Sequence, residues 1–375
     1  METEFEPARV DDVDELLRLF RLVYGTSYAL PLGTDGEVMA REISSPKTTW
    51  LVERKNGKII ASIMGTVEPS DRMGKMQALV VDPRHRGGGI ANRMVGDLAK
   101  VLLATGDADS VYGTARTTSA VPQKIHLRNG FHALGIFPNL RKAERHETMV
   151  LLTKYRDGVL ENRHPVHKAP QSLGPLLKTV HETVGLPVFP ELVPESEFQA
   201  AESSGSIELI DAPNFVQQHF DSTMIDPVRR FYPLHKPNVL LAESTGAYQV
   251  YAHLSRKDGY CTLIGATPSP MDVAPHMEKL IDELNGYGAF YIETIVPLYA
   301  FEELSAALAH GFLPVAMYPA MRKEGERWHD YVVMARTMQP LDFRGLAIDA
   351  AFQPFAEQYI DLWTQKFLNT SGVFR

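Results

Sequence analysis

The spacing of hydrophobic residues predicts four helices in the first part of the chain. Apolar side chains three and four residues apart mark one helical face at Val13, Leu16, Leu17, Phe20 and Val23. Asp11 is placed to cap this helix, and Thr34 to cap a second one that runs to Ile43. The same period recurs from Ile90 to Leu102, with a stop at Gly106, and a short helix fits residues 122–128.

Short apolar runs between turn residues predict strands around these helices. We expect strands at residues 5–10, 49–53, 59–68, 76–81, 110–114, 133–137 and 148–153. Asn56-Gly57 separates the second strand from the third, and this dipeptide is the strongest short signal for a two-residue hairpin. Helices and strands together predict an α/β domain in residues 3–154.

One junction between strand and helix carries an unusual set of residues. Asp82-Pro83 ends the strand at 76–81, Arg84 and Arg86 follow, and Gly87-Gly88-Gly89 lead directly into the helix at Ile90. Glycines let backbone N–H groups converge, and the first turn of a helix adds unpaired N–H donors and a positive dipole end. Arginine side chains suit phosphate. The junction therefore predicts a binding site for a phosphate or diphosphate.

The spacing of the glycines limits which phosphate-containing ligands the loop is expected to bind. The triphosphate loop GxxxxGK[ST] is absent, and the dinucleotide pattern GxGxxG fails because Asn92 stands at its last position. The residues that fit a known pattern are Arg86, Gly87, Gly88, Gly89, Ile90 and Ala91 after Val-x-Asp-Pro. This block resembles the acetyl-CoA diphosphate loop of the GCN5-related N-acetyltransferases (GNAT superfamily). The alternative interpretation is a glycine-rich turn before an ordinary helix.

The resemblance extends to the element order βααβββαβαββ over residues 3–154. It implies a mixed, mostly antiparallel sheet that is flanked by helices and splayed at the cofactor-binding strand. By resemblance, the main chain of Leu79, Val80 and Val81 binds the pantetheine arm of acetyl-CoA. Ser119 stands where the family often has Asn. Lys124 and Arg128 either meet the cofactor phosphates or face solvent.

The candidate catalytic residues depart from the usual pattern of the family. The family often has a tyrosine acid four residues before the Gly-Phe pair, and here that position is His126. Two interpretations stand, a general acid and a helix residue packed under the cofactor. Gln77 is the polar residue of the loop-bearing strand and cannot take a proton. More distant candidates for the base are Glu68 and the carboxylate of Arg375, and Tyr112 is an alternative hydroxyl that also fits a sheet position.

The second half of the chain repeats part of the first. Gly130-Phe131, Phe137-Pro138 and Arg141-Lys142 recur 181 residues later as Gly311-Phe312, Tyr318-Pro319 and Arg322-Lys323. Strands at 260–266, 290–296 and 330–336 and a helix at 301–310 surround the second copy. Thr267-Pro268-Ser269-Pro270 replaces the glycine loop, and proline lacks the N–H that a phosphate needs. This predicts a duplicated domain that has lost the cofactor.

We therefore expect four segments. Residues 1–155 form an N-terminal domain that binds acetyl-CoA, 156–171 a linker, 172–338 a degenerate GNAT-like domain, and 339–375 a C-terminal helix and tail. The helix is expected at 352–368, and a further helix at 172–184 in the Pro-rich connector. His164 and His167 form an HxxH in that connector, which fits a solvated loop better than a metal site, and no metal is expected.

Composition excludes several classes of protein. The net charge of −8 argues against a broad nucleic-acid or membrane surface, and the single Cys261 excludes an internal disulfide. The chain has no long apolar run and begins with acidic residues, so a cytoplasmic location is expected. The prediction is an acetyl-CoA-dependent N-acetyltransferase acting on a small-molecule or peptide amine. The alternative is a non-catalytic acyl-CoA sensor, and a homodimer is left open.

Overall fold

The computed structural model describes residues 4–25, 28, 30–142, 146–198, 205–226, 229–230 and 235–368. They group into two compact units. The first consists of Met1–Ala115, Val121–His132 and Leu152–Val159, and the second of Arg116–Ala120, Ala133–Leu151 and Leu160–Arg375. Each unit is a mixed α/β structure, which confirms the expected fold class.

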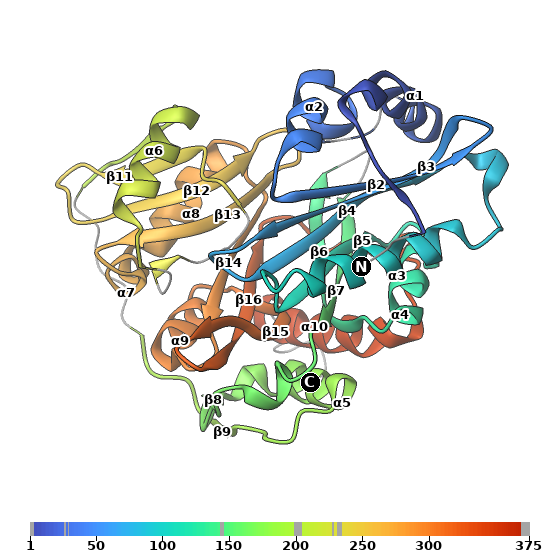
Figure 1. Cartoon of the computed structure of the whole chain (residues 1–375). Helices are drawn as coiled ribbons and strands as arrows, with labels where there is room; N and C mark the ends of the chain where they lie inside the picture. Colours follow the sequence, from blue (N-terminus) through green and yellow to red (C-terminus); the bar gives the residue numbers. More distant parts are fainter. Residues whose placement is uncertain are drawn as a thin grey trace. The chain divides into compact units, whose positions relative to one another are not determined.

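Strands of the first unit form a sheet with the order β1-β2-β3-β4-β5. Neighbouring strands are antiparallel except for the parallel pair β4–β5. Helices α1 and α2 cover one face of this sheet and α3 covers the other (Figure 1). The elements are β1 (Glu6–Pro7), α1 (Val13–Tyr24), α2 (Gly36–Ser44), β2 (Thr48–Lys55), β3 (Lys58–Glu68), β4 (Met73–Val81), α3 (Ile90–Ala104), β5 (Ser110–Arg116) and α4 (Val121–Arg128).

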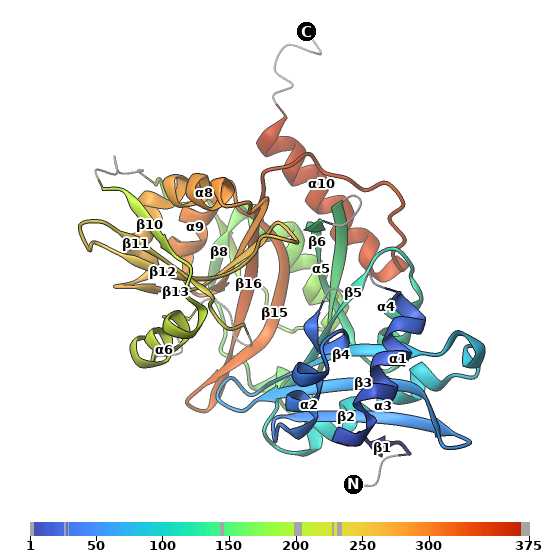
Figure 2. The same ribbon diagram turned by 90° about the horizontal axis from the view of Figure 1, so that it is seen from above.

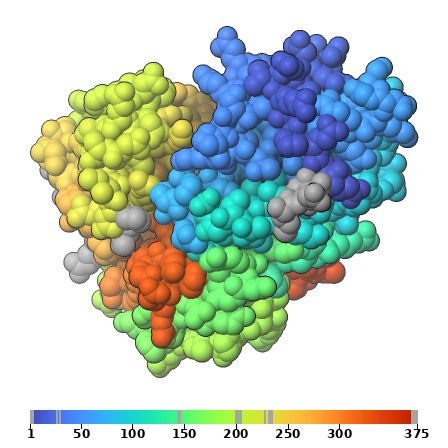
Figure 3. All heavy atoms as spheres, viewed as in Figure 1, coloured from blue at the N-terminus to red at the C-terminus, as the bar shows by residue number. Residues whose placement is uncertain are grey.

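Both faces of this sheet are buried by helices. On one face, Phe20 of α1 and Met39 of α2 join a core with Trp50 and Val80. On the other face α3 lies so close that a Cβ added to Gly65 would be 2.5 Å from Leu102 Cδ1. The outer surfaces of α1 and α2 are among the blue atoms of the space-filling view (Figure 3). Strand β4 lies between β3 and β5, and the glycine loop leaves from its end.

Three sequence predictions in the first part of the chain were wrong in detail. The first strand is only Glu6–Pro7, because residues 10–12 form a 3-10 turn in which Asp12 accepts a hydrogen bond from the Arg9 N–H at 2.8 Å. Asp12, not Asp11, is therefore at the start of α1. Helix α2 is capped by Asp35, not Thr34, since its carboxylate accepts from the N–H groups of Glu37 and Val38.

Most other elements of the first unit confirm the sequence pattern. The β2–β3 hairpin turns at Asn56-Gly57, where φ is 52° and 74°, and a two-residue turn that matches the strand twist needs positive φ at both positions. Helix α3 begins at Ile90 and ends before Gly106, as expected. Strand β4 is longer than the apolar run, because Met73–Lys75 continue its pairing with β3.

The second unit is larger. Its strands follow the order β7-β6-β15-β16-β14-β13-β12-β11-β10, with β7 included up to Leu151, and β13–β14 is parallel. Strands β10, β11, β12 and β13 lie side by side in Figure 2. Helix α6 packs on β11, β12 and β13 through Val216, Phe220 and Met224. The elements are β6 (His132–Lys142), β7 (His146–Tyr155), β8 (Lys168–Pro170), α5 (Gly174–Val184), β9 (Glu191–Val193), β10 (Ile207–Ile210), α6 (Pro213–Thr223), β11 (Val239–Glu243), β12 (Gln249–Ser255), β13 (Tyr260–Thr267), α7 (Pro270–Val273), α8 (Met277–Gly286), β14 (Tyr291–Pro297), α9 (Phe301–Ala309), β15 (Leu313–Glu324), β16 (Arg327–Thr337) and α10 (Gln353–Phe367).

The predicted elements around the second sequence copy are confirmed as β13, β14, α9 and β16, and the helices at 172–184 and 352–368 as α5 and α10. The offset of 181 residues holds in the backbone as well. It maps β5 onto β14 from end to end. It also pairs Asn139 with Ala320, which both have positive φ, 58° and 49°. The expected loose tail at 370–375, with the Arg375 carboxylate, lies outside the described residues.

The part of the chain that the structure describes contains no helix that is both long and apolar enough to cross a bilayer.

Candidate functional site

The glycine-rich junction joins the end of β4 to the start of α3. After Val81, Asp82 caps a short 3-10 turn of Pro83–His85, and Gly87 and Gly89 then have φ values of 90° and 75°. Gly89 is the N-cap residue of α3 and is left-handed, so residues with a side chain are disfavoured there. The two glycines reverse the chain within a few residues and bring the strand end next to the helix start.

The amide groups of this loop are available to a ligand. Among the described hydrogen bonds, none uses the backbone N–H of Gly87, Gly88, Gly89, Ile90 or Ala91. A Cβ built on Gly87 or Gly88 would meet no atom within 4 Å, so the loop borders open space. Unpaired N–H groups at a helix N-terminus suit an anion. The residues present therefore fit the diphosphate of a coenzyme.

The two arginines before the glycines have different partners. Arg84 forms an ion pair with Asp82, with Nη2 and Oδ2 2.6 Å apart, so its charge is compensated within the loop. Arg86 donates from Nε to the Val81 carbonyl at 3.3 Å and has no ion pair among the described residues. Arg86 is therefore the better placed of the two for an anionic ligand.

Asp82 links this loop to the pH dependence of stability. Hydrogen bonds from the side chain and backbone of Arg84 lower the pKa of Asp82 from 3.8 to about 2. A lowered folded-state pKa adds stability above the unfolded value, and this stability is lost as the pH falls toward 2.

We therefore expect Asp82→Asn to lower the Tm at pH 5 and above, and the difference from wild type to shrink between pH 4 and pH 2. Differential scanning calorimetry across that range measures it. A difference in Tm that stayed constant from pH 7 to pH 2 would contradict the assigned role of the Asp82 carboxylate.

Strand β4 carries a bulge just before the loop. Ser62 pairs with Val80 but Met64 pairs with Gln77, so β4 has one extra residue there, and Ala78 has a φ of 59°. Parallel pairing with β5 ends at Met76 opposite Gly113. The two strands separate beyond this point, which leaves the β5-facing edge of Leu79–Val81 without a strand partner among the described elements.

A tyrosine from α1 reaches the same segment. The Tyr24 hydroxyl donates to the Leu79 carbonyl at 3.3 Å, and its ring lies against Tyr28 with centroids 4.8 Å apart. The sequence pattern predicted neither the bulge nor this role of Tyr24. Nothing in Met-Gln-Ala-Leu-Val-Val distinguishes a bulged strand from a regular one, and Tyr24 fits the apolar stripe of a helix equally well.

His126 is buried in α4, with 8% of its surface exposed. Its Nδ1 lies 2.8 Å from the Pro122 carbonyl oxygen, so Nδ1 carries the proton and donates. The ring stands edge-on to Phe131, and Nε2 would be 3.2 Å from a Cβ on Gly113. Burial lowers the pKa of His126. Its neutral form has a bare Nε2, which suits packing better than proton donation.

Asn129, next to His126, holds α4 to α3. Its Nδ2 donates to the Asn92 carbonyl at 3.0 Å and to the Ile125 carbonyl at 2.9 Å. A Cβ on Gly96 of α3 would be 2.5 Å from Asn129 Oδ1, so the helices meet closely here. In the sequence, Asn129-Gly130 indicates only the end of a helix, and α4 does end there. The hydrogen bond from Asn129 to Asn92 also holds α4 against α3, the helix that begins at the glycine loop.

The remaining predicted residues lie on different elements. Lys124 is exposed on α4, whereas Ser119 is exposed in the second unit. Glu68 lies opposite Met73, at the far end of β4 from the loop. Burial alone would raise the pKa of Glu68, but hydrogen bonds and charge from Lys47 outweigh it and lower this pKa. Tyr112 is buried in β5.

No cluster of three or more metal-ligating side chains is found within the described ranges. His164 stacks on His329 with ring centroids 5.0 Å apart, and its Nδ1 lies 3.1 Å from the Pro165 carbonyl.

Known proteins resemble part of this chain. Residues 13–131 match the family model described as "Acetyltransferase (GNAT) family". Similar solved structures include a GNAT-family acetyltransferase from Streptococcus pneumoniae, with 19% identity, a TM-score of 0.37, and 41% of this chain and 99% of that chain covered. The ribosomal-protein-alanine N-acetyltransferase from Brucella melitensis has 15% identity, a TM-score of 0.35, and coverage of 40% and 99%.

A third structure holds a coenzyme. The PaiA N-acetyltransferase from Thermoplasma acidophilum, in complex with coenzyme A, has 13% identity and a TM-score of 0.32, and 42% of this chain and 100% of that chain are covered. No curated protein matches the chain.

Proposed function

We propose, from the premise that residues 13–131 form a domain of the GNAT acetyltransferase family, that this protein binds acetyl-CoA and transfers the acetyl group to an amine. The observation that carries the proposal is the run of unpaired amides at Gly87–Ala91 beside a strand that has separated from its neighbour. Acetyl-CoA supplies the activated acyl group as a thioester. The acceptor is a small-molecule or peptide amine.

Each part of the site has a role in this proposal. The N–H groups of Gly87, Gly88, Gly89, Ile90 and Ala91 bind the diphosphate, and Arg86 adds charge. The edge of Leu79, Val80 and Val81 pairs with the amide groups of the pantetheine arm, as an added strand does. Exposed Lys124 of the same unit is proposed as a further polar contact, and Ser119 stays a sequence prediction. Transfer is direct in this proposal, because no nucleophile with an adjacent base is evident near the loop among the described residues.

Incubation with acetyl-CoA and a panel of amines tests the activity, with release of the free thiol as the readout. Calorimetry with coenzyme A tests binding separately. We expect one binding site per chain and thiol release that depends on the amine. Absence of coenzyme binding would reject the whole proposal, whereas binding without thiol release across the panel would favour the second candidate below.

His126 can be tested within this assay. Removal of a general acid lowers the rate by about 100-fold or more. We expect His126→Gln, which keeps a donor for the Pro122 carbonyl, to slow thiol release by less than about tenfold and to lower the Tm, because the ring fills space against Phe131 and Gly113. A rate that fell by about 100-fold or more while the Tm stayed unchanged would restore His126 as the acid.

A second candidate function is an acyl-CoA sensor without turnover. It is favoured by the unprotonated Nε2 of buried His126 and by the pairing of Glu68 with Lys47, which leave neither an acid nor a base assigned. A sensor would change conformation or partner on binding acetyl-CoA. The thiol-release assay separates the two functions directly.

We also propose that residues 172–338, which lie in the second unit, are a degenerate copy of the fold of residues 1–155. The matched φ values at Asn139 and Ala320, and the parallel pairs β4–β5 and β13–β14, support a duplication. In the second copy β13 runs into Pro268 and Pro270, so the N–H groups of a phosphate loop are missing. The predicted boundaries, with a domain at 1–155, a linker at 156–171 and a second domain at 172–338, remain part of this proposal.

A further inference from the structure

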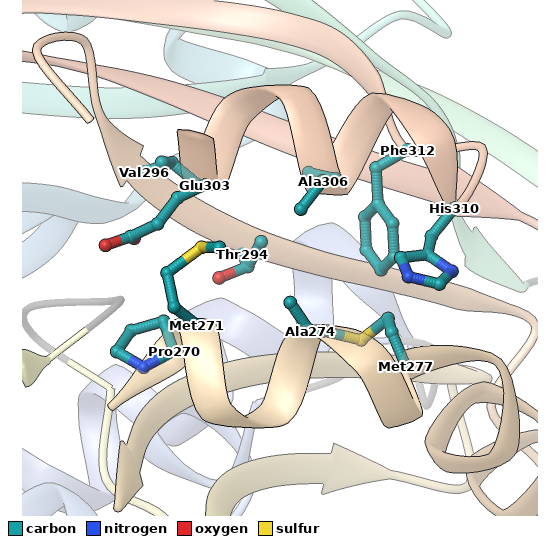
Figure 4. Close-up of a pocket in the computed structure, with 11 residues that line it drawn as sticks. Pro270, Met271, Ala274, Met277, Thr294, Val296, Glu303, Ala306, His310 and Phe312 are labelled. Atoms are coloured by element: carbon teal, nitrogen blue, oxygen red, sulfur yellow. The ribbon is translucent and has the colours of Figure 1, made fainter. Parts of the chain in front are cut away.

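A pocket opens within the second unit, over β14. Its walls are the segment from α7 to the start of α8 on one side and α9 on the other (Figure 4). About 40 Å³ of it is open to the centres of water molecules. One water needs about 10–15 Å³ on this measure, so the pocket has room for a few non-hydrogen atoms of a ligand.

The pocket has a simple origin in the duplication. The offset of 181 residues relates His126 to Ala307 and Gly113 to Thr294, and both later residues line the pocket. In the first unit the His126 ring packs on Gly113. In the second unit a methyl group replaces that ring, and the added threonine side chain does not make up the lost volume. The pocket therefore lies where a core side chain fills the corresponding position of the first unit, and the elements around the pocket are folded without a ligand.

Two buried polar atoms in this pocket have no partner among the described residues. They are Thr294 Oγ1 and His310 Nε2. His310 is 5% exposed, and its Nδ1 lies 3.0 Å from Glu278 Oε1. Because Nδ1–H donates to that carboxylate, neutral His310 presents a lone pair at Nε2. Unpartnered buried polar atoms are costly, so a water molecule or a polar ligand atom that hydrogen-bonds to them would be stabilised at this end of the pocket.

The opposite end of the pocket holds a carboxylate. Glu303 points down from α9 beside Pro270 and Met271, whereas His310 and Phe312 lie at the other end with Met277 (Figure 4). No ion pair or hydrogen bond of Glu303 occurs in the described parts of the chain, and burial raises its pKa. Apolar side chains line both ends, with Met271 beside Glu303 and with Met277 and Phe312 beside His310 (Figure 4).

We propose that this pocket is a binding site for a small aliphatic primary amine in its ammonium form. The ammonium group pairs with the Glu303 carboxylate, and the short alkyl chain packs against Met271, Met277 and Phe312. Methionine side chains are flexible and adapt to alkyl groups of different shape. The site is therefore expected to select the charge of the ligand more strictly than the shape of its alkyl chain. The site is independent of the proposed acetyl-CoA loop.

Ligand-observed NMR titration with n-butylamine at pH 7.5 tests the proposal, with n-butanol as the uncharged probe. We expect saturable binding of butylamine with a Kd below about 10 mM, which is about −2.7 kcal/mol by the usual conversion. Butanol is expected to bind at least about tenfold more weakly. Equal affinity for the two probes, or no saturation by butylamine, would overturn the proposal.

Two variants locate the site. Glu303→Gln keeps the shape, so it should weaken butylamine by about tenfold or more and leave butanol unchanged; its Tm should not fall, because a partly buried carboxylate is removed. Ala307→His restores the ring found in the first unit and should block both probes. Unchanged butylamine binding in Glu303→Gln rejects the site whether or not the second variant folds. Gly89→Val, which alters only the glycine loop, should leave both affinities as in wild type.

Discussion

Replacement of Gly89 by valine is expected to weaken coenzyme A binding by about 10- to 150-fold. Gly89 has a φ of 75°, and a β-branched residue in that region costs about 1–2 kcal/mol. The added Cβ meets only Arg93 Nη1, at 3.7 Å, so strain rather than a clash would move the loop. Movement that removes one charge-assisted hydrogen bond loses about 1.5–3 kcal/mol, which gives the stated range.

The chain offers a matched control for this substitution. Gly57 has a φ of 74° and open space around its Cβ position, and it lies in the β2–β3 turn of the same unit. Gly57→Val should lower the Tm in the same direction as Gly89→Val and leave the Kd for coenzyme A unchanged. Calorimetric titration of both variants gives the comparison. If both lost coenzyme binding equally, or neither did, the glycine loop would not be the diphosphate site.

Replacement of Gly135 by alanine is expected to lower the stability of the second unit by about 3 kcal/mol or more. Gly135 of β6 pairs with Ala316 of β15, and an added Cβ would lie 2.3 Å from the Val315 carbonyl oxygen and 2.5 Å from the Ala316 Cα. These are backbone atoms of a paired strand, so they cannot turn aside as a side chain would. Overpacking of this kind separates the strands or distorts their register.

Urea unfolding measures this effect, with Gly286→Ala as the control. Gly286 ends α8 in the same unit, and a Cβ there meets nothing within 4 Å. Alanine at a helical position costs nothing and reduces the freedom of the unfolded chain, so this variant should be neutral or slightly more stable. An equal urea midpoint for Gly135→Ala and wild type would show that β6 and β15 can move apart without cost.

Several features could be predicted because their causes are local. The turn at Asn56-Gly57 follows from two residues that tolerate positive φ, and α3 follows from its own apolar stripe and the glycines at each end. The anion-binding character of the loop also follows from the chain itself, since glycines and a helix start leave amides unpaired wherever they occur together. Prediction from local sequence failed where two equivalent residues are adjacent. Asp11 and Asp12 both suit the start of α1, and the structure has Asp12 there.

The amino-acid sequence by itself determined the glycine loop, the elements around it and the echo at residues 311–323, because backbone freedom and hydrophobic period act between near neighbours. The tertiary structure alone decided the bulge at Ala78, the packing of His126 on Gly113 of β5 and the space left beside Ala307. Each of these depends on an element that is not adjacent in the sequence: β3, whose register sets the bulge, β5, which contacts the histidine ring, and the segment from α7 to the start of α8, which faces Ala307. The sequence therefore determines which side chains are available, whereas packing between segments that are distant in the sequence determines which of these side chains can contact a ligand.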